Sequence, residues 1–572
     1  MSTPVLLVVT TAVVALAPAM ARRVHLPAPS VLFLLGCALA VLPLGGQVHL
    51  EPEFVLLVLL PVILYWEGYT TSVQHAWRYR RAIVLTAVPL VIATAAAVAV
   101  TAHAWGSSWA AAWILGAVLA PTDASAVAAY ARALPLRLMT ILRGESLIND
   151  GTALVLLGIA ISAAQGAHVS VASAAGELAW AYAGGIAAGA LVAAAGLLAV
   201  RRTQDPSVLA AVSVAEPFAA SVLAEAVHAS GVVAVVTCAL GISRSARRAV
   251  PAHGRLQVHA FWETTSWLVN GSLFVLVGLE ARSVFDAPAV DAGRAGTLIG
   301  QGLLLAALLM AVRVTWLFLT AWLVRLVDRR PVQRELRVPW RLRLVAAWSG
   351  MRGGTSLAAA LSVPLSVEGA PFPERDVILV LTFVVVGTTL LVQGATLPLT
   401  IGWVERTGER ASSARCSSDG RAVGGRTGAR PAGTPPAGRQ PAVATGREEE
   451  VAALAAAIAT LSAAVDEHLQ RAVERDPAAS GAVEVLRRQV HPTRTALDGG
   501  ERELLQRLQH STLQREREVL AALVARGELE DTQMWRLQER LDLDEALLLA
   551  DRDLPPAPAP RHAGRASPSG CR

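Results

Sequence analysis

Long runs of apolar residues, separated by short polar stretches, occupy this chain from its start to about residue 405. Most are roughly 17–25 residues long, which is what an α-helix needs to cross a bilayer. The pattern predicts an all-α polytopic membrane protein with about thirteen transmembrane helices. The expected spans are residues 3–20, 29–45, 53–73, 82–102, 107–130, 138–163, 178–200, 207–225, 227–243, 260–281, 296–324, 342–366 and 377–403.

Arginine marks every second loop of this arrangement. The chain has no Lys, and Arg occurs near residues 22–23, 78–81, 132–137, 201–202, 244–248 and 325–343. Cytoplasmic loops are enriched in Arg and Lys. Thirteen spans make Arg-rich and Arg-poor loops alternate, whereas treating 207–243 as one span breaks the alternation. We therefore expect a multi-pass plasma-membrane protein with its N-terminus outside and its C-terminus in the cytoplasm.

Two of the expected spans carry helix-breaking residues directly beside a charge near mid-depth. The fifth carries Pro121 before Thr122 and Asp123, and the twelfth carries glycines on both sides of Arg352. These spans correspond when the thirteen are divided as six, one and six. Many transporters consist of inverted repeats with broken helices at matching positions. The sequence thus predicts six-helix inverted repeats with broken crossing helices inside the membrane domain, residues 1–405.

The chain after the membrane domain divides by composition into three parts. Residues 406–447 are rich in Arg, Gly and Pro and are expected to form a flexible linker. Residues 448–552 show helical apolar spacing and predict a small cytosolic helical region, regulatory or dimer-forming. Residues 553–572 are expected to be disordered.

Composition narrows the classes of function. Only 16% of residues are charged, and the net charge of +6 is explained by Arg in loops and tail, so a nucleic-acid partner is not expected. No cysteine spacing matches a metal site. The sequence predicts no cofactor and no catalytic residue. The four cysteines are Cys37, Cys238, Cys416 and Cys571.

Charged residues at membrane depth carry the functional signal. Asp123, Asp150 and Arg352 lie near the middle of apolar segments. A charge at the bilayer centre costs about 2.5–3.5 kcal/mol on insertion scales, so such residues usually face a water-filled path or a partner. These three positions predict a protein that moves ions or protons.

An oxygen-rich group surrounds Asp150 in the sequence. Glu145 and Asn149 are i,i+4 neighbours on the sixth expected span, and so are Ser146 and Asp150. Pro121 removes a backbone donor from the adjacent span, so a carbonyl such as that of Thr122 is free to bind a cation. The expected site therefore holds a monovalent cation at Asp123 and Asp150.

The same carboxylates can bind protons, because burial disfavours their charged form. Proton and cation then compete for one site, and alternating access converts competition into exchange. Arg352 is expected to offset buried negative charge as a structural partner of Glu145. Glu67 is either an acid behind the site or an interfacial charge.

Three segments resemble cation/proton antiporter family 1, which includes the NhaP-type and animal-type sodium/proton exchangers. They are APTDASAVAAYARALPLRLMTILRGESLINDGTALV, EAVHASGVVAVVTCALGI and WSGMRGGTSLAAALSVPL. The resemblance covers roughly residues 1–405. It implies a thirteen-helix inverted-repeat antiporter, usually a homodimer, in which a core domain moves against a dimerisation domain.

The resemblance also implies roles for single residues. Asp150 matches the essential carboxylate of an Asn-Asp motif, which is typical of electroneutral members. Ala124 stands where many members have Pro, and Arg143 where an acid is common. Asn149 matches the neighbour of the carboxylate, Thr122 and Asp123 match the unwound helix, and Ser146 matches a coordinating hydroxyl. Glu145 and Arg352 match a structural ion pair. Glu67 matches an acid that reaches the ion through water.

The leading hypothesis is a sodium/proton antiporter that serves pH and sodium homeostasis, with sodium, potassium or lithium ions, protons and the lipid bilayer as its partners. Potassium/proton exchange is the nearest alternative. An intramembrane aspartyl protease is an alternative of another class, but the Gly-x-Gly-Asp element of such enzymes is missing. A membrane sensor or scaffold would not need the paired acids.

Overall fold

The computed structural model describes most of the chain and divides it into two units. Unit 1 comprises Met1–Val250 and Gln257–Val451, and unit 2 comprises Pro251–Leu256 and Ala452–Arg572. Residues 406–445 of the expected linker and 553–572 of the expected tail lie outside the described residues. The described residues are 3–41, 54–404, 446–475, 499–526 and 534–545, except 72, 129, 131–133, 135, 168, 204, 250–251, 287–291, 328–337, 368–369, 373 and 535–536.

Unit 1 is helical, as expected. Its described strands, β1 (Ser366–Val367) and β2 (Ala370–Pro371), form a minimal antiparallel pair. Eight described helices are long and apolar enough to cross a membrane, and four more apolar helices are shorter. The count of thirteen and the inverted repeats remain predictions.

In chain order the helices are α1 (Thr3–Val24), α2 (Ala28–Val41), the π-helix η1 (Val55–Leu59), α4 (Leu60–Thr70), α5 (Val73–Arg78), α6 (Arg80–Ala87), α7 (Pro89–Ala104), α8 (Trp109–Leu119), α9 (Ser125–Ala128), α10 (Leu136–Ala164), α11 (Val171–Val200), α12 (Pro206–Ala226), α13 (Gly231–Ala249), α14 (Ala252–Leu279), α15 (Ala281–Phe285), α16 (Ala292–Val327), α18 (Trp340–Trp348), α19 (Gly354–Leu361), α20 (Arg375–Thr388) and the π-helix η2 (Thr389–Gln393).

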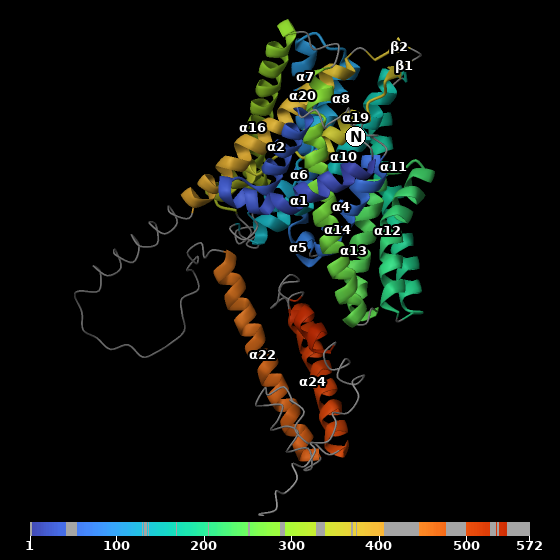
Figure 1. Cartoon of the computed structure of the whole chain (residues 1–572), viewed down its shortest axis with the longest axis vertical. Helices are drawn as coiled ribbons and strands as arrows, with labels where there is room; N and C mark the ends of the chain where they lie inside the picture. Colours follow the sequence, from blue (N-terminus) through green and yellow to red (C-terminus); the bar gives the residue numbers. More distant parts are fainter. Residues whose placement is uncertain are drawn as a thin grey trace, which may run out of the picture. The chain divides into compact units, whose positions relative to one another are not determined.

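Contacts within unit 1 define two groups among its helices (Figure 1). Helices α11, α12 and α13 pack against one another, and α4 packs on α13. Helices α7, α8, α16 and α20 form the second group, to which α19 adds through α8 and α20. Helix α10 contacts members of both groups. The helix that carries the Asn-Asp pair therefore lies where the two groups meet.

The apolar stretch 207–243 forms two helices, as the alternation of charged loops requires. Helix α12 begins after Asp205, whose side chain accepts a hydrogen bond of 2.8 Å from the amide of Ser207. Helix α12 ends at Ala226 and α13 begins at Gly231. Between them, His228 adopts a positive φ of 54°. A non-glycine residue in this left-handed region is uncommon and marks a tight reversal of the chain.

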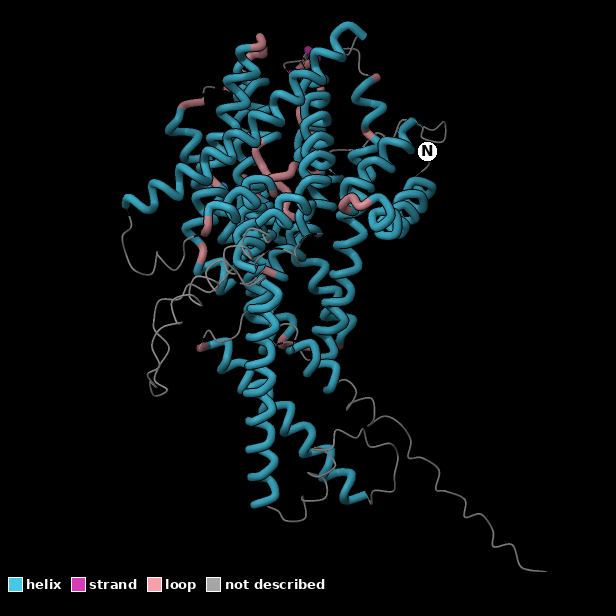
Figure 2. The backbone as a smooth tube through the Cα atoms, turned by 90° about the vertical axis from the view of Figure 1, so that its left-hand side faces the viewer, coloured by secondary structure: helices cyan, strands magenta, loops and turns pink. Residues whose placement is uncertain are grey.

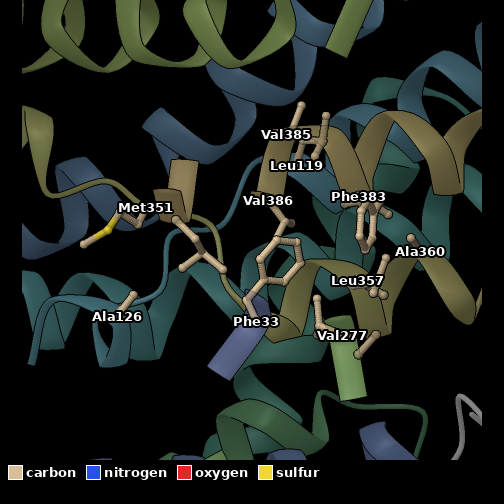
Figure 3. Close-up of a cluster of buried hydrophobic side chains, with 14 of the residues drawn as sticks. Phe33, Leu119, Ala126, Val277, Met351, Leu357, Ala360, Phe383, Val385 and Val386 are labelled. Atoms are coloured by element: carbon tan, nitrogen blue, oxygen red, sulfur yellow. The ribbon is translucent and has the colours of Figure 1, made fainter. Parts of the chain in front are cut away.

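The two expected interruptions are present. The chain is non-helical between α8 and α9 and again between α18 and α19, and Figure 2 shows loop segments inside the helical bundle. Leu119 at the end of α8 and Met351 within the second interruption lie with Val385 and Val386 of α20 in a single apolar cluster (Figure 3). Both interruptions are therefore enclosed by the apolar core of unit 1.

Unit 2 has its own small core. Leu461 of α22 (Gly446–Arg475) packs with Leu513 and Leu520 of α24 (Gly499–Ala525). A buried acid, Asp542, accepts hydrogen bonds from Arg255 at 2.5 Å and Arg517 at 2.9 Å. Buried charges are tolerated when they are paired and hydrogen-bonded, as here.

Candidate functional site

The first interruption begins at Pro121. Helix α8, capped at its start by the Ser108 side chain, ends at Leu119 because proline has no N–H with which to continue the helix. The chain then runs without helical structure until α9 begins at Ser125. Thr122 and Asp123 therefore lie in non-helical backbone, as the sequence predicts.

The second interruption runs alongside the first. The backbone N–H of Asp123 donates a hydrogen bond of 2.8 Å to the carbonyl of Met351. Gly353 lies against the carboxylate of Asp123, and a Cβ atom at this glycine would overlap that carboxylate. The absence of a side chain at position 353 thus allows the two segments to meet.

Asp123 uses one carboxylate oxygen locally. Its Oδ1 atom accepts hydrogen bonds from the backbone N–H of Ser125 at 2.8 Å and from the Ser125 hydroxyl at 2.5 Å. This is the side-chain cap that a short helix such as α9 needs at its N-terminus. The Ser125 hydroxyl also lies 3.4 Å from the side-chain oxygen of Asn270 on α14.

Helix α10 presents its polar residues to the first interruption. The Asn149 side chain donates to the Thr122 hydroxyl at 2.9 Å and to the Thr122 carbonyl at 3.3 Å. The Ser146 hydroxyl accepts a hydrogen bond of 3.2 Å from the backbone N–H of Ala124. A proline at position 124 could not donate this bond, so Ala124 gives Ser146 a backbone partner.

Asp150 has an unused carboxylate oxygen. It is 6% exposed, and its Oδ1 atom has no hydrogen-bond partner in the described chain. Asp123 and Glu67 both lie close enough to Asp150 to interact electrostatically. Glu67, on α4, also interacts electrostatically with Asp123 and Arg143. Its role as an acid behind the site, and not as an interfacial charge, stays a prediction.

The structure corrects the expected ion pair. Glu145 binds Arg313 of α16, with a nitrogen–oxygen distance of 2.5 Å, and both side chains are buried. Arg352 is instead held by backbone carbonyls: it donates to Leu119 at 3.1 Å and to Gly350 at 2.6 Å. These carbonyls are left without helical donors at the interruptions, so a buried guanidinium satisfies them.

Arg313 had a signal that the sequence analysis missed. It is the one charged residue within the expected span 296–324, just as Asp150 is central to its own span. The rule that marks a charge at membrane depth as functional or paired applies equally to it. The Thr122 hydroxyl donates to Glu145 at 3.2 Å, so the Arg313–Glu145 pair is tied to the first interruption.

No group of three or more His, Cys, Asp or Glu residues with metal-binding geometry occurs among the residues that the structure describes. The oxygens at the first interruption and on the adjoining part of α10 are those of the Asp123 and Asp150 carboxylates, the Thr122 and Ser146 hydroxyls and the Thr122 carbonyl. Unwound backbone at the crossing of two interrupted membrane helices, with a buried acid beside it, is the arrangement of a secondary transporter.

Comparisons with known proteins identify the family. The profile described as "Sodium/hydrogen exchanger, transmembrane" matches residues 9–403. An uncharacterised Na+/H+ exchanger of Mycobacterium bovis is 42% identical over 401 residues, covering 70% of this chain and 74% of the relative. The chain belongs to the transmembrane sodium/hydrogen exchanger family, and sodium/proton antiport is the function that this membership supports.

A more distant relative and a solved structure are also similar to the chain. A Bacillus subtilis protein named a sodium, potassium, lithium and rubidium/H+ antiporter is 30% identical over 388 residues, covering 65% of this chain and 58% of the relative. The sodium/proton antiporter MjNhaP1 of Methanocaldococcus jannaschii superposes with a TM-score of 0.55 at 16% identity, over 69% of this chain and 96% of that structure. The likeness to MjNhaP1 supports the fold alone.

Proposed function

We propose that the protein exchanges sodium ions for protons across the plasma membrane and that Asp150 binds one or the other. The observation that carries this proposal is the free Oδ1 atom of Asp150, which is buried beside both interruptions. An anionic carboxylate without a basic partner is costly to bury. No ion pair of Asp150 occurs among the described residues, so a bound proton or cation stabilises it.

Competition at one carboxylate couples the two ions. Proton and cation use the same oxygen and exclude each other, and alternating access carries them in opposite directions. Because Asn149 is neutral, Asp150 is the one carboxylate of the Asn-Asp pair. It therefore binds one monovalent ion, either the cation or the proton, in each half of the cycle. The proposed exchange is therefore one cation for one proton. The oxygens around the ion are provided or positioned by Asp123, Thr122, Ser146 and Asn149. Glu67 adds negative charge that attracts the cation. The Arg313–Glu145 pair and Arg352 hold the interruptions in place.

The remaining parts of the proposal concern the whole protein. They are a role in pH and sodium homeostasis, an outside N-terminus, a cytoplasmic C-terminal region and a homodimer. Potassium is the second candidate cation, because the name of the Bacillus subtilis relative includes it. The aspartyl protease alternative is not supported, since Asp123 uses Oδ1 to cap α9 and the relatives are exchangers.

Everted membrane vesicles with a pH-sensitive dye test the proposal. Sodium should dissipate a preformed proton gradient, and Asp150→Asn should abolish this response. Asp286→Asn, an exposed acid with the same substitution, should leave it intact. Failure of sodium, potassium and lithium alike to dissipate the gradient would overturn the antiporter function. Full activity in Asp150→Asn would remove Asp150 from the coupling site. Clamping the membrane potential should not change the rate if exchange is one for one.

A further inference from the structure

A narrow cavity adjoins Asp150. Its volume of about 10 Å³ has room for roughly one water-sized species. A cation inside it must have lost most of its hydration shell, so protein oxygens have to replace the lost water. The walls come from η1, α4, α8, α10 and α19, and they include Pro121 of the first interruption and Thr355 just after the second.

The oxygen atoms available to such a cation are few. Among the residues that line the cavity, Asp150 and Thr355 alone have polar side chains, and the others are Leu, Ala or Pro. Asp150 contributes its free Oδ1 atom. Thr355 contributes a hydroxyl oxygen, which retains lone pairs for a cation while its proton points elsewhere.

A third oxygen follows from the backbone. Ala117 also lines the cavity, and the regular helical donor to its carbonyl would be the N–H of Pro121, which does not exist. Two neighbouring carbonyls that the interruption frees already have partners: Leu119 accepts from Arg352 at 3.1 Å, and Thr122 accepts from Asn149 at 3.3 Å. The Ala117 carbonyl lacks the donor that continues a helix.

We propose that the Thr355 hydroxyl is a cation ligand that acts with Asp150 and the Ala117 carbonyl and sets the affinity for the dehydrated cation. The inference rests on the proposed function, because it assigns a further ligand to the same exchange site. Oxygen ligands at unwound segments suit a hard monovalent cation. A proton needs only the carboxylate, so Thr355 affects cation binding and leaves proton binding to Asp150.

Three variants test the assignment. Thr355→Val keeps the side-chain shape and removes the hydroxyl, and Thr355→Ser keeps the hydroxyl. Thr382→Val is the matched control: Thr382 of α20 is buried, its hydroxyl has no partner in the described part of the chain, and it does not line the cavity. The variants are compared as full-length protein in everted vesicles, over a range of sodium concentrations and pH.

Thr355→Val should raise the sodium concentration for half-maximal exchange about tenfold, equivalent to about 1.4 kcal/mol, with little change in the rate at saturating sodium. At low sodium its activity should shift to higher pH, because protons then compete better for Asp150. Thr355→Ser should restore most of the affinity, and Thr382→Val should match the wild type.

Two results would overturn the assignment. One is an unchanged sodium dependence in Thr355→Val; the other is an equal loss in Thr355→Val and Thr355→Ser, which indicates packing and not ligation. Sodium-induced thermal stabilisation of the purified protein gives a readout independent of transport, because a ligand that binds the folded state raises its stability. Failure of the proposed function is distinguishable, since the wild type itself would then show no cation-dependent exchange.

Discussion

The N–H of Asp123 donates a hydrogen bond of 2.8 Å to the carbonyl of Met351, and this bond joins the two interrupted helices of the membrane unit. Several of the backbone groups that the interruptions free are satisfied by the other interruption or by a nearby side chain. Buried backbone groups left unpaired cost free energy comparable to a lost hydrogen bond. The two non-helical segments are therefore stable together, and a change in one should be felt in the other.

Gly353→Ala should disrupt this junction. The added Cβ would overlap the carboxylate of Asp123. Inserting an atom into a packed site typically costs about 1–3 kcal/mol. We expect a lower melting temperature in detergent and strongly reduced sodium/proton exchange. Gly300→Ala on α16 is the control, since its added Cβ would meet no atom within 4 Å apart from its chain neighbours and its own helix backbone. A Gly353→Ala variant with wild-type exchange would contradict the close contact.

Arg313→Gln should destabilise the protein more than any exposed arginine change. It leaves Glu145 buried without its ion partner, and breaking one side of a buried pair costs about 3–5 kcal/mol. Arg294→Gln, at an exposed position of the same helix, should have little effect. Thermal unfolding of the purified protein measures both. An Arg313→Met variant also leaves Glu145 unpaired, and adding Glu145→Leu to it should recover part of the lost stability. A further fall in melting temperature would argue against the pair.

Tyr65 and Glu216 form a second buried contact away from the exchange site. The Tyr65 hydroxyl donates to the Glu216 carboxylate, and both side chains are at most 4% exposed. Tyr65→Phe removes the donor and should cost about 1–3 kcal/mol, because a buried acceptor loses its partner. Glu216→Gln keeps an acceptor oxygen and should be milder. Melting temperatures rank the two; a more damaging Glu216→Gln would show that the charge itself is required.

The stability of unit 2 should depend on pH through His468. Burial, and then the charges of Arg515, Arg471 and Arg475, lower the pKa of His468 from 6.5. Below pH 6.5 the unfolded state therefore binds more protons than the folded state, so stability falls as the pH drops toward the lowered pKa. Hydrogen-exchange protection of α22 and α24, corrected for intrinsic rates, should decrease as the pH is lowered from about 7.5 to about 5.5.

His468→Gln provides the control for this effect. It removes the titrating group and should flatten the pH dependence of protection in α22 and α24. Ser511, whose hydroxyl lies 3.1 Å from the His468 ring, keeps a polar neighbour in that variant. An unchanged pH dependence in His468→Gln would assign it to other groups of unit 2.

Local pattern predicts much of the membrane unit. The apolar runs place the helices, the charged loops require two helices in 207–243, and Pro121 and the glycines around Arg352 mark the interruptions. Asn149 and Asp150 stand out because charge and polarity at membrane depth are rare. Each of these predictions depends on residues close in sequence or on the energetic cost of placing a residue in a bilayer. That is why no tertiary contact is needed to make them.

Only the tertiary structure decides which groups meet across the chain. Glu145 pairs with Arg313, 168 positions away, and not with Arg352, because Arg352 is held by the carbonyls that the interruptions leave free. The free oxygen of Asp150 and its narrow cavity with Thr355 depend on several helices packing at once. Sequence alone determined that buried acids and broken helices exist. Packing determined their partners, because a buried charge takes the complementary group that the fold brings within reach.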